Sequence, residues 1–305
     1  MNYFITGGCG LIGSSIIKKI NIKKNNIYVA DRKKINLSKK IKNFFKIDIT
    51  KDHKKLHTIL KKNKIDCIIH LAAFLGVKRT EQNPLKVLKV NYLGTKNLLT
   101  ACKNTNVKTF IFSSSSEIYG EQKKKITEIS NPNPRSLYGF SKLQAENLIK
   151  EFCIEKKINF KIIRLFNIYG SIQNSSFVIP RFIDSALKNK NITLYGNGLQ
   201  IRSFCFVEDA VQGILKIIRS KKKNLIYNIG NDLEPIKILN LAKKIINLTN
   251  SNSKIIKVAF SSSDRSKSRE IFKRIPNILK ARKELSYFPK ISLENGLKSI
   301  LKNKY

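Results

Sequence analysis

The sequence predicts an α/β fold: a Rossmann-like doubly wound parallel sheet with a smaller, interleaved α+β lobe. First, short apolar runs alternate with longer amphipathic stretches through about residue 165. Second, these runs are apolar on both faces, which is typical of parallel strands covered by helices on both sides. Third, this rhythm loosens beyond residue 165, where Gly, Pro, Asn and Ser recur in residues 167–180 and 195–203. The chain has 305 residues, enough for one large domain or two modest ones.

The elements of the predicted sheet follow in a repeating order of strand and helix. Each apolar run has the length of a strand, and each stretch between the runs has helical spacing of its apolar residues. This order is typical of βαβ units, in which the strands are parallel. The expected strands cover residues 3–5, 27–30, 44–47, 67–70, 110–112 and 160–163, and the expected helices cover residues 11–20, 53–62, 87–103 and 143–156.

The chain is expected to cross between its two parts rather than complete them in turn. Residues 1–165 are expected to form the Rossmann domain, to which the chain returns at about residues 201–228, where a further helix and strand pattern occurs. Residues 166–200 and 229–305 are expected to form the smaller lobe. Because no low-complexity linker separates these segments, the two domains are expected to be interleaved.

Composition limits the classes of function. Lys plus Arg number 60 and Asp plus Glu number 20, so the formal net charge is +40, and nucleic acid has to be considered as a partner. The basic residues are nearly all lysines scattered along helical stretches, and no helix-turn-helix, RNP-like or zinc-finger spacing occurs. Solvated lysine faces are the simpler interpretation, and we expect no nucleic-acid partner.

We also expect a cytoplasmic protein without a metal site or a membrane segment. No apolar run reaches the roughly 18 residues that span a bilayer, and Met1 leads directly into an expected strand without the pattern of a signal peptide. The cysteines lack Cys-x-x-Cys spacing and have mostly apolar neighbours, which indicates free buried thiols in a reducing compartment. They are Cys9, Cys67, Cys102, Cys153 and Cys205.

A glycine-rich loop follows the first expected strand. Gly7, Gly10 and Gly13 are spaced three apart and open the first expected helix, which begins with Leu11 and Ile12. Glycines at this spacing let the backbone turn tightly and approach a pyrophosphate, which the positive end of the helix stabilises. A glycine trio alone also fits an ordinary tight turn, but its position directly after a strand predicts a dinucleotide site.

Acidic residues after the second and third strands bear on the identity of the dinucleotide. Asp31 lies 18 residues beyond Gly13, where a carboxylate accepts hydrogen bonds from an adenosine ribose and repels a 2′-phosphate, so NAD is favoured over NADP. Arg32 and the two lysines after it weaken this preference, since cations there accommodate an extra phosphate. Asp48 and Ile49 suit the adenine edge, and a helix N-cap region is an equally good interpretation.

Tyr138 and Lys142 are four residues apart, and therefore lie on one face at the start of an expected helix. An ammonium beside a phenol stabilises the phenolate, so we expect Lys142 to lower the pKa of Tyr138 and make it an acid/base near neutral pH. A Tyr-x-x-x-Lys pair is common by chance. It becomes informative because residues 113–116, all serines, follow the strand at residues 110–112 and can share the proton of a substrate with the tyrosine.

Motifs along nearly the whole chain resemble those of the extended short-chain dehydrogenases/reductases that act on nucleotide sugars as epimerases, dehydratases and decarboxylases. Together these motifs are far more specific than any one of them. They are TGGCGLIG at residues 6–13, HLAA at 70–73, NYLGT at 91–95, SSSSEIYG at 113–120, Tyr138 with Lys142, RLFNIYG at 164–170 and QIRSF at 200–204.

The resemblance implies roles for individual residues. Ser115 matches the catalytic Ser or Thr, and Tyr138 and Lys142 match the acid/base and its activator. Residues expected to line NAD are Leu71, Ala72, Ala73 and Ser113, and residues expected to hold the nucleoside diphosphate are Asn167, Phe177, Val178, Tyr195, Arg202 and Asn228. Arg202 has the charge for a diphosphate oxygen. Candidates for a second phosphate contact are Arg265, Arg269 and Arg274, for which a solvated basic loop is an equally good interpretation.

In this family the reaction begins with hydride removal from the sugar to tightly held NAD, which leaves a keto-sugar. Sugar 4,6-dehydratases carry an Asp-Glu pair after the catalytic Ser or Thr, whereas this chain has Ser116 and Glu117, so simple dehydration is disfavoured. Ser-Glu occurs in UDP-glucuronate decarboxylases, which also have an arginine where Arg274 stands. Many bacterial nucleotide-sugar 4-epimerases have the same Ser-Glu and a similar Arg-x-Pro segment, so this pattern does not separate the two.

We favour a 4-epimerase that supplies surface polysaccharide precursors, with Glu117 as a further catalytic-site residue, and a decarboxylase is the alternative. A non-catalytic Rossmann regulator that binds NAD would have no reason to keep Ser115, Tyr138 and Lys142 together. In the family, helices such as those expected at residues 87–103 and 143–156 form a four-helix dimer interface, so a homodimer is expected. The alternative is that both apolar stripes only cover the sheet.

Overall fold

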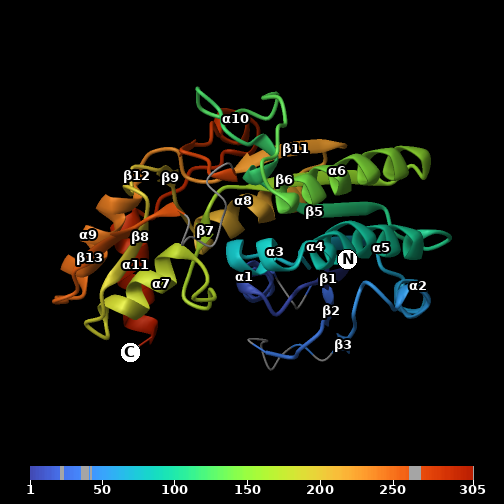
Figure 1. Ribbon diagram of the computed structural model, residues 1–305. Helices are drawn as coiled ribbons and strands as arrows, with labels where there is room; N and C mark the ends of the chain where they lie inside the picture. The colour runs from blue at the N-terminus through green and yellow to red at the C-terminus, as the bar shows by residue number, and fades with distance from the viewer. Residues whose placement is uncertain (21–23, 36–40, 42, 261–268, 305) are drawn as a thin grey trace.

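The computed structural model describes residues 1–20, 24–35, 41, 43–260 and 269–304, and it confirms the doubly wound α/β fold. Figure 1 shows a large sheet with its helices on the right of the view and a smaller lobe on the left. The sheet has seven parallel strands in the order β11-β6-β5-β4-β1-β2-β3. Its strands are β1 (Asn2–Thr6), β2 (Asn26–Asp31), β3 (Asn43–Lys46), β4 (Cys67–His70), β5 (Thr109–Ser115), β6 (Asn159–Leu165) and β11 (Leu225–Ile229).

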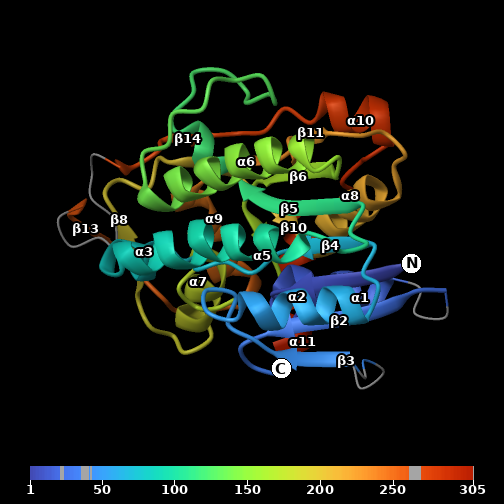
Figure 2. The ribbon, with the colours of Figure 1, turned by 90° about the vertical axis from the view of Figure 1, so that its right-hand side faces the viewer.

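Helices cover both faces of this sheet because the strands are apolar on both faces. One face carries α1 (Leu11–Lys19), α8 (Val207–Arg219) and α10 (Leu279–Leu285), whose buried residues Ile17, Val211 and Ala281 belong to one core cluster. The other face, in front in Figure 2, carries α2 (His53–Lys62), α5 (Gly94–Cys102) and α6 (Leu137–Glu155), with Leu56 and Ile149 in a second cluster.

The helix expected at residues 87–103 is not one regular α-helix. Instead, α4 (Pro84–Leu88) passes into a π-helical turn, η1 (Lys89–Leu93), before α5 begins. The π turn is associated with a buried polar contact: the Asn91 amide bonds both the N–H and the C=O of Phe74 and donates to Ser141 Oγ at 3.1 Å. An extra residue in a helical turn is a recurrent feature beside functional sites, and spacing of apolar residues does not reveal it.

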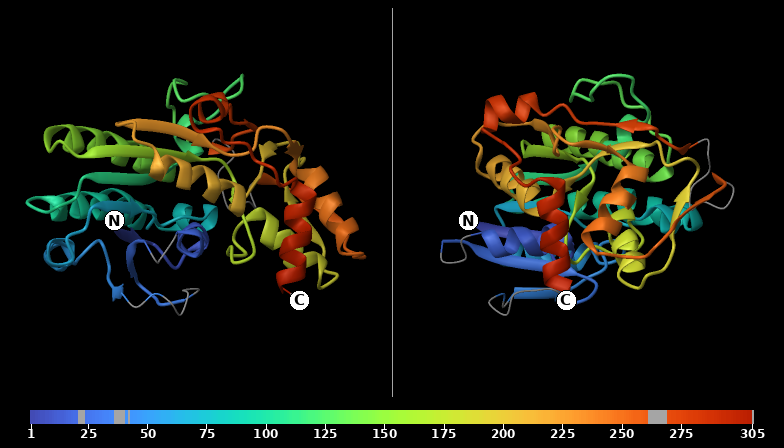
Figure 3. Two further views of the ribbon diagram at one scale, coloured as in Figure 1. Left: turned by 180° about the vertical axis from the view of Figure 1, so that it is seen from behind. Right: turned by 90° about the vertical axis from the view of Figure 1, so that its left-hand side faces the viewer.

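The smaller lobe has its own apolar core. Leu241 and Ile245 of α9 (Ile238–Leu248) pack with Leu297 of α11 (Leu293–Lys304), and the right panel of Figure 3 shows these two helices side by side. Small sheets complete the lobe and its junction with the Rossmann part. Their strands and the remaining helices are α3 (Val77–Gln82), η2 (Ser116–Tyr119), β7 (Ile168–Tyr169), α7 (Val178–Ala186), β8 (Ile192–Tyr195), β9 (Ile201–Ser203), β10 (Cys205–Phe206), β12 (Pro235–Lys237), β13 (Ile255–Val258) and β14 (Lys273–Arg274).

The five cysteines are free and buried, as expected from their apolar neighbours. None of the helices in the described parts of the chain combines the length and the apolar character that crossing a bilayer requires.

A buried lysine links the sheet to α8. Lys161 on β6 is only 2% exposed, and its Nζ donates to the carbonyl oxygens of Ile217 at 2.8 Å and Ser220 at 2.6 Å, at the C-terminal end of α8. Lys161→Met is expected to lower the free energy of unfolding by about 1–3 kcal/mol, since it leaves buried carbonyls without a donor. Urea denaturation measures this, with Lys223→Met at an exposed lysine as the control. Equal stability of the two variants would contradict the assigned role of Lys161.

Candidate active site

A cavity of about 590 Å³ lies between the carboxyl ends of β1, β4 and β5 and the smaller lobe. Its volume is in the range of small-molecule sites, and its place is where open α/β sheets bind ligands. Most of the residues singled out in the sequence line it: Gly7, Gly10, Leu11, Ile12, Gly13, Leu71, Ala73, Ser113, Ser115, Glu117, Tyr138, Lys142, Asn167, Phe177, Val178, Tyr195, Arg202 and Arg274.

The glycine loop leaves no room for a side chain at Gly7 or Gly13. Gly7 has φ +69°, and a Cβ there would lie 2.7 Å from Ala72 N, while a Cβ on Gly13 would lie 2.6 Å from the Gly8 Cα. Helix α1, described throughout, has Gly10 as its N-cap, no side-chain cap and no acidic residue in its first turn. Its first N–H groups and positive dipole end therefore remain available to a pyrophosphate, so these residues fit a dinucleotide such as NAD.

Asp31 and the other adenosine-side candidates lie outside the lining of the cavity. Asp31 Oδ2 accepts a hydrogen bond from Cys9 N at 3.1 Å, which holds the carboxylate beside the glycine loop, as a ribose ligand requires. Its Oδ1 accepts from the backbone N–H of Arg32. Ala72 N donates to Thr6 Oγ1, which fixes the HLAA segment against the end of β1.

Asp48 mainly organises the turn before α2. Burial opposes ionisation, but hydrogen bonds from Thr50 N and Oγ1 hold the pKa of Asp48 below its usual value. This agrees with the helix N-terminal role that the sequence left open. Ile49 is buried, and its carbonyl accepts from Asn97 Nδ2.

Ser136 fixes the helix that carries Tyr138 and Lys142. It is the N-cap of α6, where its Oγ accepts from Gly139 N at 3.1 Å, and the same hydroxyl donates to Glu117 Oε2 at 2.9 Å. Tyr138 hydrogen-bonds Ser115 at the end of β5. The start of α6, the end of β5 and η2 thus bring a phenol, a hydroxyl and a carboxylate to one wall of the cavity.

The expectation that Lys142 lowers the pKa of Tyr138 is wrong for this structure. Lys142 Nζ donates instead to the carbonyl oxygen of Ser113 at 2.8 Å and lies over the Phe112 ring. Burial lowers the pKa of Lys142 to about 7. Burial, followed by the charge of Glu117, raises the pKa of Tyr138 to about 12, although the bond with Ser115 opposes this. The four-residue spacing correctly predicted that Tyr138 and Lys142 lie at one site. It did not reveal that the Lys142 ammonium donates to the Ser113 carbonyl oxygen.

Glu117 and Arg274 form a buried ion pair across the cavity wall. Arg274 Nη1 donates to Glu117 Oε1, and Arg274 Nη2 donates to Asn167 Oδ1 at 3.0 Å. Among the described residues Arg274 Nε has no hydrogen-bond partner, although it is buried. Arg274 lines the cavity with the rest of its side chain, so its guanidinium charge is near any anionic ligand there.

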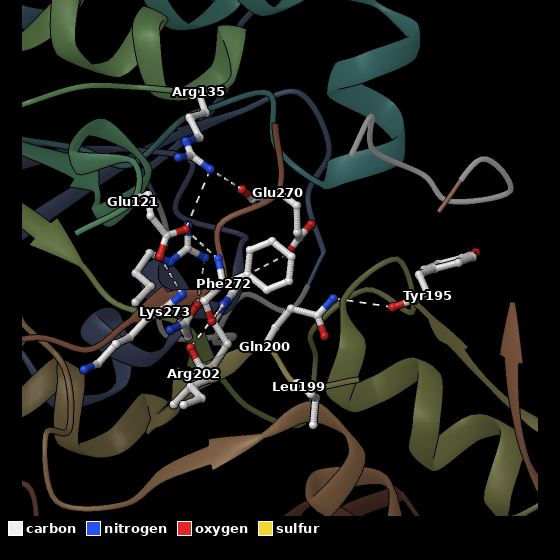
Figure 4. Close-up of polar contacts among 12 residues, drawn as sticks. Glu121, Arg135, Tyr195, Leu199, Gln200, Arg202, Glu270, Phe272 and Lys273 are labelled. Atoms are coloured by element: carbon white, nitrogen blue, oxygen red, sulfur yellow. Dashed lines mark hydrogen bonds and ion pairs between the residues drawn. The ribbon is translucent and has the colours of Figure 1, made fainter. Parts of the chain in front are cut away.

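Arg202 also reaches the cavity, where it is already paired with a carboxylate. Its Nη2 lies 3.0 Å from Glu270 Oε1, and Figure 4 shows the two side chains facing each other. Arg269, the neighbour of Glu270, pairs with Glu81 of α3 rather than with the cavity. Arg265 lies outside the described residues.

Asn228 is not part of the cavity, contrary to expectation. It is fully buried, its Oδ1 accepts from Tyr119 OH at 2.8 Å, and its Nδ2 donates to the carbonyl oxygen of Ile126. Tyr119 in turn accepts a hydrogen bond from Arg164, which pairs with the buried Glu146. The amide of Asn228 is thus used by the core.

Four residues at the site were not expected from the sequence. Arg181 of α7 lies over the Tyr195 ring, 5.2 Å from its centroid, and Phe260 lines the same part of the cavity. Glu270 supplies the counter-charge of Arg202. Ser136 had a local signal, since a serine at the start of a helical stretch is a typical N-cap. The other three depend on contacts between distant segments.

The comparisons with known proteins agree with this geometry. The model of the NAD dependent epimerase/dehydratase family matches residues 3–230. A dTDP-D-glucose 4,6-dehydratase of Dictyostelium discoideum is 35% identical over 80% of this chain, which spans 61% of that protein. A UDP-N-acetyl-alpha-D-glucosaminuronate decarboxylase of Bacillus cytotoxicus is 32% identical over 97% of this chain and 95% of its own length.

A solved structure has the same fold over the whole chain. The UDP-glucuronic acid 4-epimerase of Bacillus cereus, in complex with UDP-glucuronic acid and NAD, is 27% identical, and the match covers 100% of both chains with a TM-score of 0.89. The chain described here therefore belongs to the NAD-dependent epimerase/dehydratase family of extended short-chain dehydrogenases/reductases, whose members act on nucleotide sugars.

Proposed function

We propose that this enzyme oxidises C4 of a nucleotide-linked hexuronic acid, decarboxylates the 4-keto acid, and then returns the same hydride to C4, so that the product is a nucleotide-linked pentose. NAD, when bound along the glycine loop, supplies the hydride acceptor for C4. Tyr138 and Ser115 would share the proton of the 4-hydroxyl group, since they are hydrogen-bonded to each other at the cavity wall. Lys142, buried at the same cavity wall, would hold the cofactor.

The ion pair between Glu117 and Arg274 is the observation on which we base the proposal of decarboxylation. A ketone at C4 makes the C6 carboxylate a leaving group: the C5–C6 bond breaks, carbon dioxide leaves, and the electron pair remains as an enolate until C5 takes a proton. Arg274 lines the cavity, and its guanidinium would supply positive charge and N–H donors to a sugar carboxylate. Glu117, whose charge Arg274 balances, stands beside Ser116 to orient the protonation. The named activity of the Bacillus cytotoxicus relative supports this choice.

A 4-epimerase, which the sequence favoured, takes second place. There the 4-keto sugar turns over in the cavity and is reduced on its other face, which needs no acid or base beyond Tyr138. The Bacillus cereus epimerase supports this reaction, since it matches the whole chain. Dehydration is disfavoured because this chain has Ser116 where sugar 4,6-dehydratases have the acidic Asp. A non-catalytic regulator would not need Tyr138, Ser115 and Lys142 at one cavity wall.

Incubation of the purified enzyme with UDP-glucuronate, UDP-glucose and UDP-N-acetylglucosamine in separate reactions tests the proposal. We expect carbon dioxide and a UDP-pentose from UDP-glucuronate, identified by NMR of the product. Interconversion of 4-epimers without carbon dioxide would replace this proposal with the second candidate.

We further propose a homodimer, which acts in the cytoplasm on precursors of surface polysaccharides. Buried residues of α5 and α6 such as Leu99 and Ile149 cover the sheet, yet Leu93 and Phe140 on the outer side of η1 and α6 are exposed by 45% and 44%. Apolar side chains exposed on neighbouring helices suit an interface. Light scattering at micromolar concentration is expected to give twice the monomer mass of 34.9 kDa, and a monomer would refute the dimer.

A further inference from the structure

The strand that carries Arg274 has only two residues. Strand β14 consists of Lys273 and Arg274 and pairs with β9, and the chain after it is bridged to Ile126, whose N–H donates to the Ile275 carbonyl oxygen. The backbone N–H groups of Phe272 and Lys273 are both bound by one side chain: Glu121 Oε2 accepts from Phe272 at 2.6 Å, and Glu121 Oε1 accepts from Lys273 at 3.0 Å. Figure 4 shows this carboxylate facing the two N–H groups. Charge-assisted bonds of this kind are about twice as strong as neutral ones.

Glu121 lies four residues after Glu117, so one segment of chain contacts β14 twice. The side chain of Glu117 binds the Arg274 guanidinium, and the side chain of Glu121 binds the backbone just before it. Gly120 between them has φ +61°, and a Cβ there would lie 2.0 Å from the carbonyl oxygen of Asn133. This close approach fixes the path of the segment and the spacing of its two carboxylates.

Arg135 reinforces the same contact from the other side. Its Nη1 donates to the carbonyl oxygen of Glu270 at 2.7 Å and lies 3.7 Å from Glu121 Oε2. The guanidinium therefore balances the charge of Glu121 and binds the chain two residues before Phe272. The backbone leading into β14 is held at Glu270, Phe272 and Lys273 by two charged side chains.

We propose that Glu121 is a positioning residue: it anchors β14 so that the Arg274 guanidinium stands beside Glu117 at the cavity wall, where the substrate carboxylate would bind. The role rests on the proposed decarboxylation. Glu121 does not line the cavity, so it acts through Arg274 rather than on the sugar. Displacement of a reacting group by about 1 Å can cost 10²-fold in rate, which makes such an anchor consequential.

Steady-state kinetics on UDP-glucuronate test the anchor. Glu121→Ala is expected to lower kcat for carbon dioxide release by about 10-fold to 10²-fold and to raise KM, because Arg274 is displaced from the substrate carboxylate, with normal NAD content. Glu121→Gln, which keeps one acceptor oxygen, is expected to lose less. The matched control is Glu234→Ala. Like Glu121, Glu234 lies outside the cavity and accepts a backbone N–H, that of Leu293 at 2.7 Å, but this N–H belongs to α11 and not to β14.

A double-mutant cycle separates positioning from a general structural effect. In an Arg274→Met background, Glu121→Ala is expected to cost less than about 2-fold, because the group it positions is gone. Equal losses in both backgrounds, or an unchanged kcat in Glu121→Ala, would overturn the proposal.

Hydrogen exchange distinguishes failure of the anchor from failure of the proposed function. Wild-type enzyme that releases no carbon dioxide refutes the function, and the anchor is then judged by exchange alone. Glu121→Ala must speed exchange of the Phe272 and Lys273 amides, and Glu234→Ala must not. Unchanged protection of these two amides in Glu121→Ala would overturn the anchor whatever the substrate.

Discussion

Tyr138→Phe is expected to lower kcat by about 10²-fold to 10⁴-fold, the contribution of a positioned acid/base group. The substitution removes only the hydroxyl that bonds Ser115, while the ring keeps its place at the start of α6. The fold, the melting temperature and the bound NAD are therefore expected to remain nearly unchanged. Turnover of UDP-glucuronate measures kcat, and an enzymatic assay of the NAD released by denaturation measures the bound cofactor.

Lys142→Ala provides the contrast. Its Nζ holds the Ser113 carbonyl and lines the cavity next to the glycine loop, so its loss is expected to reduce activity and NAD content together. Tyr138→Phe at near-normal rate would show that the acid/base is another group, even if Lys142→Ala behaved as expected.

The part of the site that the sequence predicts is the part built by adjacent segments. Gly7 and Gly13 follow β1 directly, and Tyr138 and Lys142 lie one helical turn apart. The carboxyl ends of parallel strands meet at one edge of a sheet, so the order of strands and helices along the chain is enough to place Ser115 of β5 beside them.

The part that the sequence does not predict depends on chain segments that meet only in the folded protein. Arg274 is 157 residues from Glu117, and no local pattern shows that the two pair or that one nitrogen remains free. The family resemblance assigns Asn228 to the substrate, but a side chain on a strand can also bond inward, and this one binds Tyr119. The pKa of Lys142 likewise depends on burial, which spacing does not show.

Glu117→Gln is the second substitution with a large expected effect. If Glu117 orients the protonation of the enolate, carbon dioxide release from UDP-glucuronate is expected to fall by about 10²-fold or more. Gln keeps the size of the side chain and an acceptor for Ser136, but it removes the charge that balances Arg274. The unpaired guanidinium is then free to bind the sugar carboxylate more tightly, so KM is expected to fall or stay constant while kcat falls.

Loss of a buried ion pair also affects stability, and the experiment has to separate the two effects. Removing one partner of such a pair costs up to about 3–5 kcal/mol. Asp232→Asn is the matched control, because Asp232 pairs with Arg282 in the described structure without lining the cavity. Asp232→Asn is expected to lower the melting temperature with kcat nearly unchanged, whereas Glu117→Gln lowers kcat at temperatures where both variants are folded. If Glu117→Gln releases carbon dioxide within about 10-fold of wild type, Glu117 has no part in proton transfer. Epimerisation, which needs no such group, would then explain the site better.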